Sequence, residues 1–366
     1  MRILILNWRD IKNPKSGGAE ILTHEIAKSW VKMGNEVALF SSHFGGSSNF
    51  ETIDGVRIVR KGNPDTRSLF SSVHFAAFIF YIKNSKDFDV VVDEVHGIPF
   101  FTPWYVRKRK VVLICEVASN LWVTMFGPVF GPIGRMIEQF YIRWVYKNIP
   151  YLTISDSSKE ELIKEGVNPE KITVLPMGVT VPKEIKRVSK EKDPTIIFVG
   201  RLAKSKGIED AIEMLGKVLS KYPKARLWIV GGGPEEYMGY LKKMAKKLRI
   251  ESKITFLGFV TEDKKFELMG RAHVLVAPSV KEGWGLIVPE AAYVGTPSIV
   301  YNSPGLRDVL KGSNYKTIVK VNTPDALAEE VVKLLEEGNT GRYKKIDIKD
   351  YSWNKTAETA LKVMLK

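Results

Sequence analysis

The sequence holds a single cysteine, Cys115, among its 366 residues. One cysteine excludes a disulfide within the chain and fits a reducing compartment. Since 44% of the residues are hydrophobic, the chain can bury sizeable cores without cross-links. These features predict a cytoplasmic protein.

The chain also lacks a long apolar run. Residues 75–82 (FAAFIFYI) form the longest purely apolar run of note, far short of the ~20 residues that cross a bilayer. The chain opens directly on the apolar stretch MRILILN, without the charged segment, apolar segment and cleavage site of a secretory signal. We therefore expect a protein that is not secreted by that route and that is soluble or peripheral on the inner face of a membrane.

The chain has fewer acidic than basic residues: 41 Asp and Glu compared with 56 Lys and Arg, which gives a net charge of +15. The excess is spread along the chain. Such a balance suits nucleic acid, an anionic membrane surface, phosphorylated ligands or simply a solvated, lysine-rich surface. The sequence contains no nucleic-acid-binding motif, and the Lys-rich run 242–247 falls on the polar face of a predicted helix. We therefore expect no nucleic-acid partner.

Both halves of the chain alternate predicted strands with predicted helices. The length predicts about two domains, and the alternation predicts an α/β fold with parallel, doubly wound sheets. The charged stretch 182–194, which contains prolines near both ends, is typical of a linker. The expected domains are therefore residues 1–181 and residues 195–351.

The stretch 278–297 (PSVKEGWGLIVPEAAYVGTP) holds the most informative pattern. It follows the apolar run AHVLVA, a predicted buried strand, and its Pro289 suits the first turn of a helix. A loop between a strand's carboxyl end and a helix's amino end is where open α/β sheets bind ligands. Free amides at the helix start favour phosphate there, and Gly283 and Gly285 allow its close approach. The stretch therefore predicts a ligand-binding loop.

Two carboxylates, Glu282 and Glu290, stand in that loop with seven residues between them. A carboxylate has two acceptor oxygens, so it can hold two neighbouring sugar hydroxyls, at about 1.5–3 kcal/mol for each charge-assisted bond. The simpler alternative is a glycine-rich loop with solvated glutamates. Upstream, Arg201 and Lys206 follow the predicted strand TIIFVG. This basic pair would suit a departing diphosphate, and a surface ion pair is the alternative.

Three segments together, residues 198–212, 278–297 and 295–310, resemble the C-terminal half of the family 4 glycosyltransferases. The resemblance covers most of the chain. It implies the GT-B fold, in which two Rossmann-like parallel-sheet domains face a central cleft, with the nucleotide sugar on the second domain and the acceptor on the first. It also implies that a closing helix within residues 352–366 completes the first domain.

The resemblance implies a role for each candidate in the second domain. Arg201 and Lys206 would stabilise the departing diphosphate, Glu282 would contact the transferred sugar, and Glu290 would hold the ribose hydroxyls. Backbone amides would hold the diphosphate, and they belong to Gly17, Gly18, Gly285, Leu286 and Ile287. For the two glycines of the first domain, a tight structural turn is the alternative.

The first domain adds candidates at two predicted strand ends. His96 follows one strand and is placed to contact the acceptor or the sugar, although it could also cap or pack. In the resembling family, the end of the strand KVVLIC commonly carries a histidine that contacts the donor sugar, whereas this chain has Cys115 or Glu116 there. We expect the contact at Glu116, because Cys115 could only pack or donate weakly.

Residues 119–147 mix many aromatics with Arg135, Arg143 and Lys147. Core packing with partly covered surface is one interpretation. The other is an interfacial surface, since aromatics with basic residues dock on anionic lipid headgroups. A lipid-linked acceptor would explain such a surface.

The resemblance therefore implies a retaining glycosyltransferase of hexosyltransferase type, which moves a sugar from a nucleoside diphosphate sugar to a hydroxyl of a glycan or lipid-linked acceptor. Asp87 and Asp89 form a D-x-D, the metal signature of another glycosyltransferase fold, but they stand at the entrance of a predicted strand, away from the expected cleft. We expect no metal and no other cofactor. Two alternatives stay open: a catalytically silent sugar-nucleotide-binding subunit, or a GT-B epimerase or phosphorylase.

Overall fold

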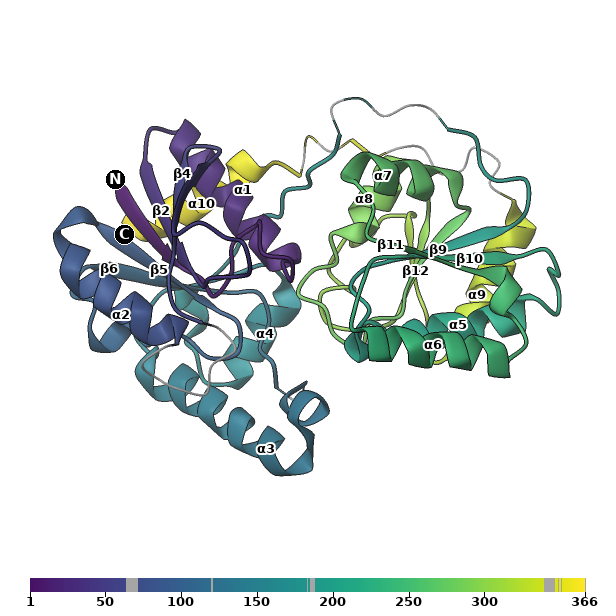
Figure 1. The fold of residues 1–366 in the computed structure, drawn as a ribbon, viewed down its shortest axis with the longest axis horizontal. Helices are drawn as coiled ribbons and strands as arrows, with labels where there is room; N and C mark the ends of the chain where they lie inside the picture. The colour runs from purple at the N-terminus through teal and green to yellow at the C-terminus, as the bar shows by residue number, and fades with distance from the viewer. Residues whose placement is uncertain are drawn as a thin grey trace. The chain divides into compact units, whose positions relative to one another are not determined.

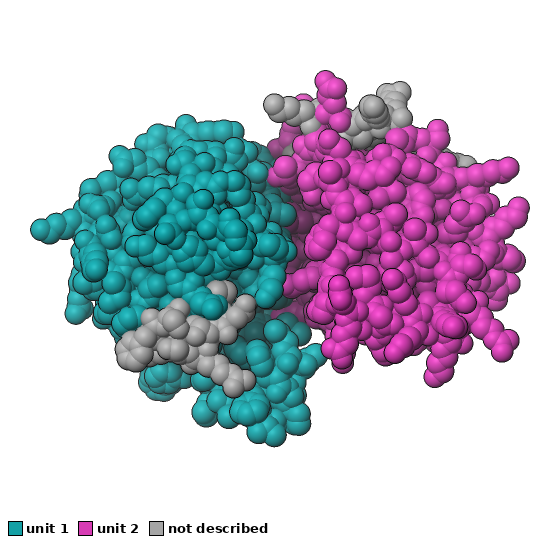
Figure 2. Space-filling model, viewed as in Figure 1, with its two compact units in different colours: residues 1–178, 351–366 teal, residues 179–350 magenta. Residues whose placement is uncertain are grey.

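The computed structural model describes residues 1–63, 72–119, 121–182, 184, 188–338, 346–347, 349 and 351–365. The chain forms two compact units (Figure 2). Unit 1 is Met1–Gly178 with Tyr351–Lys366, and unit 2 is Val179–Asp350. The division thus falls slightly before the boundary expected at residue 181. No helix among the described residues is both long enough and apolar enough to cross a membrane.

Unit 1 is built on an eight-stranded sheet in the order β3-β4-β2-β1-β5-β6-β7-β8. Neighbouring strands run parallel, except β3 and β4. The strands are β1 Arg2–Leu6, β2 Glu36–Ser41, β3 Phe50–Ile53, β4 Val56–Arg60, β5 Val90–Val95, β6 Arg109–Ile114, β7 Tyr151–Thr153 and β8 Ile172–Val174. The helices and helical turns are α1 Gly18–Lys32, α2 Val73–Asn84, η2 Ser85–Asp87, η3 Thr102–Trp104, α3 Leu121–Phe140, η4 Tyr141–Val145, α4 Asp156–Lys164, η5 Pro169–Lys171 and α10 Trp353–Leu365.

The strands at the centre of this sheet are buried on both faces, as parallel sheets require. On one face, Val73 and Tyr81 of α2 pack in one cluster with Leu4 and Leu6 of β1. The apolar runs of β1 and β5 therefore form the core between helices. Their carboxyl ends carry the polar residues of the unit's candidate site.

The last helix, α10, packs against α1 and returns the chain to unit 1. The indole Nε1–H of Trp30 in α1 donates to the carbonyl of Ala357, 2.9 Å away, and both residues are buried. Gly178 lies against the ring of Trp353, where a Cβ on Gly178 would stand 2.2 Å from Cδ2. The absence of a side chain at Gly178 therefore allows the ring of Trp353 to pack directly on the backbone of unit 1.

Unit 2 is built on a six-stranded parallel sheet in the order β11-β10-β9-β12-β13-β14. The strands are β9 Thr195–Val199, β10 Arg226–Val230, β11 Ile254–Gly258, β12 Val274–Ala277, β13 Ser298–Val300 and β14 Lys316–Ile318. The helices and helical turns are η6 Lys204–Lys206, α5 Ile208–Val218, α6 Glu235–Lys247, η7 Glu251–Lys253, α7 Glu262–Arg271, α8 Ile287–Tyr293 and α9 Pro324–Glu337. Figure 1 shows α7 and α8 on one face of this sheet and α5, α6 and α9 on the other. The two sheets confirm the predicted α/β fold.

The charged stretch before β9 is tied to unit 2. Residues 183 and 185–187 of the expected linker lie outside the described residues. Farther on, the ammonium of Lys190 donates to Thr296 Oγ1 at 2.7 Å, and burial lowers the pKa of this lysine to about 8. Arg271 Nε donates to Glu191 Oε1 at 2.7 Å. This part of the stretch is therefore an anchored segment of unit 2.

Gly178→Ala should lower the free energy of unfolding by about 1–3 kcal/mol, because the added methyl group overpacks against Trp353. Gly45→Ala is the matched control, since no atom lies within 4 Å of its ideal Cβ position. The control should change stability by less than about 0.5 kcal/mol. Urea denaturation of both variants measures the difference, and equal stabilities would contradict the described position of Trp353.

Candidate active site

Two loops of unit 2 meet beyond the carboxyl ends of the neighbouring strands β9 and β12. The amide of Val280 donates to the carbonyl of Ser205 at 3.0 Å. Gly207 adopts a φ of 66°, and a Cβ there would lie 2.1 Å from the carbonyl oxygen of Pro278. Glycine suits both this backbone conformation and this close approach, so the loop after β9 lies directly on the loop after β12.

This contact brings Lys206 and Glu282 together as an ion pair between Nζ and Oε2. The two side chains are 21% and 17% exposed, so the pair is shielded but reachable. Arg201 lies on the same loop as Lys206 and is exposed. The structure therefore places three of the predicted site residues at one edge of the sheet.

The glycine-rich loop is held by a second close backbone approach. A Cβ on Gly305 would stand 2.3 Å from the carbonyl oxygen of Glu282, and Gly285 adopts a φ of 92°. Leu286 caps α8, whose first residue is Ile287. The amides expected to face a diphosphate therefore stand at the start of α8, where a helix leaves its first N–H groups without intrahelical partners.

Glu290 lies in the first turn of α8 and is buried. Lys265 of α7 pairs with it, with 3.0 Å between Nζ and Oε2, and the same ammonium pairs with Glu262 at 2.7 Å. Burial raises the pKa of Glu290, and the charge of Lys265 opposes that rise. Lys265 was not predicted from the sequence, because its position in the chain does not show that α7 packs on α8.

Phe259 is a second residue at this edge of the sheet that was not predicted from the sequence. It follows β11 with 79% of its surface exposed, and a Cβ on Gly232 would lie 2.2 Å from its ring carbon Cε2. An exposed aromatic ring at this edge of the sheet has a face on which a planar base can stack. A single apolar residue in a loop gives no signal of that orientation in the sequence.

In unit 1, a buried carboxylate at the end of β5 orients His96. Glu94 accepts hydrogen bonds from Asn7 Nδ2 at 2.8 Å and from Thr23 Oγ1 at 2.5 Å. Its other oxygen lies 2.9 Å from His96 Nε2, and the His96 ring stacks on Trp8 with 5.7 Å between centroids. Burial raises the pKa of Glu94. Burial opposes the charged form of His96, but the Glu94 carboxylate outweighs it and raises the pKa of the ring.

The predicted glycine turn opens α1, which begins at Gly18 after the N-cap Gly17. The amide of Gly17 donates to Oε2 of Glu20 at 2.7 Å. The side chain of Glu20 therefore already accepts a hydrogen bond from an amide that was predicted to bind diphosphate. A diphosphate could reach the Gly17 amide only by displacing this carboxylate.

The two candidates at the end of β6, Cys115 and Glu116, differ in burial. Cys115 is buried, and burial raises the pKa of its thiol well above the usual value. Glu116 is half-buried and lies on the carboxyl side of the strand. Glu116 therefore remains the candidate for a contact with a ligand, while Cys115 packs.

The D-x-D sequence lies at the opposite edge of the sheet from these residues. Asp89 pairs with Arg2 at 2.8 Å, and the hydrogen bond from the guanidinium lowers the pKa of Asp89 to about 2. Across the described residues, no group of three or more His, Cys, Asp or Glu side chains could hold a metal ion.

Two family descriptions match the chain in succession. "Glycosyltransferase Family 4" matches residues 16–182, and "Glycosyl transferases group 1" matches residues 181–351. The chain belongs to the family 4 glycosyltransferases. It is 26% identical to an uncharacterized glycosyltransferase of Methanocaldococcus jannaschii, over 99% of this chain and 97% of that protein.

Solved structures resemble this glycosyltransferase at the level of the fold. Sucrose-phosphate synthase from Thermosynechococcus elongatus matches with a TM-score of 0.76 and 17% identity, over 100% of this chain and 96% of that one. Anabaena HepE in complex with UDP-glucose matches with a TM-score of 0.72 and 16% identity, over 99% and 98% of the two chains. These likenesses confirm the predicted GT-B fold.

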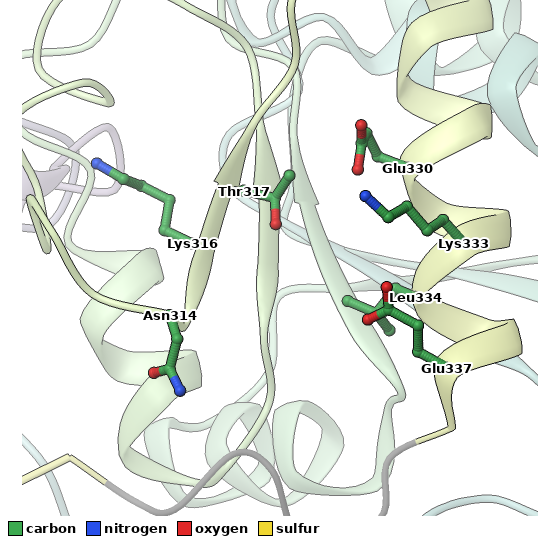
Figure 3. Close-up of a pocket in the computed structure, with 7 residues that line it drawn as sticks. All are labelled: Asn314, Lys316, Thr317, Glu330, Lys333, Leu334 and Glu337. Atoms are coloured by element: carbon green, nitrogen blue, oxygen red, sulfur yellow. The ribbon is translucent and has the colours of Figure 1, made fainter.

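A hollow in unit 2 of the glycosyltransferase lies away from the two loops. Figure 3 shows it between β14 and α9, with Lys333 and Glu330 reaching from α9 toward the strand. Asn314 and Lys316, which also line it, stand at the amino end of β14. The hollow is therefore at the wrong end of the sheet for a ligand held by Arg201 and the glycine-rich loop.

Lys265→Met should destabilise the glycosyltransferase by about 3–5 kcal/mol at neutral pH, because it leaves Glu290 buried without its ion pair. The loss should grow as the pH rises. Burial holds the folded-state pKa of Glu290 above its unfolded value, so stability present in acid is lost as the pH rises through the folded-state pKa.

Denaturation across roughly pH 5–8 measures this dependence. Adding Glu290→Gln to Lys265→Met should remove it. The control is Lys264→Met, which changes a more exposed neighbour and should cost at most about 1 kcal/mol. A stability of Lys265→Met that does not change with pH would contradict the assigned pair.

Proposed function

We propose that this glycosyltransferase moves a hexose-type sugar from a nucleoside diphosphate sugar to an acceptor hydroxyl, with retention of the anomeric configuration. The observation that carries the proposal is the Lys206–Glu282 ion pair where two loops meet, beside the exposed Arg201. Cations next to a carboxylate suit a ligand that joins a diphosphate to a sugar. The structure of the Anabaena protein with UDP-glucose supports a donor of this class.

The proposed reaction depends on positive charge at the departing group. Breaking the bond between the anomeric carbon and the phosphate oxygen builds negative charge on the diphosphate. Arg201 and Lys206 stabilise that charge, and the amides at the start of α8 assist them. When the donor binds, Lys206 exchanges Glu282 for the phosphate oxygens, which turns the Glu282 carboxylate toward the hydroxyls of the sugar.

The nucleoside is held by groups farther from the reacting bond. Glu290 accepts hydrogen bonds from the ribose hydroxyls, and the charge of Lys265 favours the ionised form of this buried carboxylate. Phe259 stacks on the base. These contacts place the diphosphate over Arg201 and Lys206.

The acceptor side uses residues of unit 1. His96, oriented by Glu94, contacts the acceptor or the transferred sugar. Glu116 accepts a further hydroxyl. The acceptor is a glycan or a lipid-linked sugar, and the proposed reaction uses no metal or other cofactor because Arg201 and Lys206 supply the positive charge.

A catalytically silent sugar-nucleotide-binding subunit is the second candidate. It is favoured by Cys115 and Glu116, which stand where the family commonly has a histidine. A thermal-shift screen with uridine, guanosine and adenosine diphosphate sugars identifies the donor, because a ligand that binds only the folded state raises the melting temperature. Binding without transfer to any acceptor would favour the silent subunit, and release of free nucleoside diphosphate without an acceptor would favour an epimerase.

Arg201→Ala and Lys206→Ala should each lower turnover by roughly 10²–10³, because each removes a preorganised positive group from the departing diphosphate. Donor binding should be partly kept. Lys204→Ala changes an exposed lysine in the same turn and should retain wild-type turnover. Steady-state kinetics together with donor affinity measure both effects, and wild-type turnover in either active-site variant would refute the assignment.

A ribonucleotide donor should bind better than its deoxyribose counterpart, because Glu290 offers two acceptor oxygens to two hydroxyls. Loss of one charge-assisted bond should cost about 1.5–3 kcal/mol, or roughly tenfold or more in affinity. Calorimetric titration of matched ribose and deoxyribose diphosphates measures the ratio. Glu290→Gln should reduce the preference, whereas equal affinities in the wild type would count against the role of Glu290.

A further inference from the structure

The most unusual surface of unit 1 is the outer face of α3 and η4. Gly127, with a φ of 75°, breaks α3 into two segments. We define the outer face by residues that follow this break, Val129, Phe130, Met136, Phe140 and Trp144, whose exposed fractions lie between 51% and 71%. Figure 1 shows α3 at the lower margin of unit 1. Large apolar patches on a protein surface mark sites of interaction.

The opposite side of α3 carries small and charged residues. Gly134 is buried, and a Cβ on it would lie 2.3 Å from Cε3 of Trp122. The buried carboxylate of Glu138 accepts the amides of Ala118 and Ser119 at 2.7 and 2.8 Å. A surface helix of a globular protein turns its apolar side inward. In α3 the large apolar side chains are exposed instead, and the buried side holds Gly134 and Glu138. The outer face is therefore suited to contact with an apolar partner.

The charge around the outer face is positive. Glu138 is the only acidic residue between positions 117 and 155, and it is buried. Arg143 and Lys147 are exposed on either side of Trp144, but the guanidinium of Arg143 pairs with the buried Glu165, with 3.1 Å between Nη2 and Oε2. Aromatic and basic residues at the end of an apolar helix face match the headgroup region of an anionic bilayer.

A second copy of the chain fits this face less well. A twofold contact sets the same patch against itself. The segment that carries the patch has no exposed carboxylate to receive Lys147 of the other copy. An anionic bilayer supplies the negative charge that a second copy lacks.

The outer face is linked to the acceptor side of unit 1. Trp122 packs on Gly134 with one part of its ring, and a Cβ on Gly97 would lie 3.3 Å from its Cη2. Gly97 directly follows His96. One tryptophan therefore connects the helix that carries the outer face to the residue proposed to contact the acceptor.

We propose that the outer face of α3 and η4 docks on the surface of an anionic bilayer. Its apolar side chains enter the headgroup region, and Lys147 meets the lipid phosphates. The docked enzyme takes its acceptor hydroxyl from a lipid-linked sugar in that membrane. This last step rests on the proposed transfer function, whereas the docking does not.

Sedimentation with vesicles of phosphatidylcholine and phosphatidylglycerol in equal parts, without donor, tests the docking. The wild type should pellet with these vesicles and bind pure phosphatidylcholine more weakly. Phe130→Ser should weaken binding roughly tenfold or more, since it removes one aromatic side chain that would be buried in the bilayer on docking. Phe50→Ser is the matched control, because Phe50 is 62% exposed elsewhere on unit 1 and should bind like the wild type. Lys147→Gln should weaken binding only to the anionic vesicles, about fivefold.

Two outcomes overturn the docking: wild-type protein that stays in the supernatant, or Phe130→Ser that pellets as well as the wild type. Light scattering tests the second copy as occupant. A wild-type dimer that Phe130→Ser converts to a monomer, without vesicle binding, also overturns the proposal.

The lipid-linked acceptor has its own readout. Transfer should be faster to a lipid-linked sugar in the vesicles than to the same sugar in water, and equal rates would contradict the choice of acceptor. A thermal-shift measurement with nucleoside diphosphate in the same samples tests the donor site separately from membrane docking. If the nucleotide did not raise the melting temperature, the donor site would be contradicted and the result with vesicles would still hold.

Discussion

A single backbone hydrogen bond, from the amide of Val280 to the carbonyl of Ser205, joins the two loops on which the candidate donor site depends. The loops can approach this closely because Gly207 has no side chain and turns beneath Pro278 with a positive φ. The contact sets the amino group of Lys206 beside the carboxyl group of Glu282. A basic and an acidic side chain thus stand at the same edge of one sheet, as the proposed contacts with phosphate and with sugar hydroxyls require.

Both units hold a buried carboxylate beside their candidate site, and the two are stabilised in different ways. Glu290 is held by the full charge of Lys265. Glu94 is held by neutral donors, Asn7 and Thr23, together with the ring of His96. Burial raises the pKa of both acids, so their partners decide the form in which each acts. The charged partner favours the ionised form of Glu290, as its proposed role requires, while one oxygen of Glu94 bonds the imidazole of His96.

Local patterns in the sequence were enough to predict the sheets and the loop between β12 and α8, because apolar runs, glycine and proline determine the structure of their own neighbourhood. The partner of Glu290 was not predictable, since Lys265 reaches it only through the packing of α7 on α8. The bond from the amide of Gly17 to Glu20 had a local signal, the G-x-x-E spacing of a helix start. For α3, the periodicity of the sequence shows that one side of the helix is apolar. It does not show whether that side faces the core or the solvent, because this depends on the domain burying the opposite side, which carries Glu138.

The return of α10 to unit 1 has a consequence for biosynthesis. This helix is translated after the whole of unit 2, so the domain that begins first is completed last. Until α10 is made, the surface of unit 1 around Trp30 and Gly178, on which α10 packs, is uncovered. By the time α10 is made, every strand of unit 2 has already left the ribosome. Unit 2 can therefore fold as an independent body during synthesis, while the half-finished unit 1 presents apolar surface to chaperones.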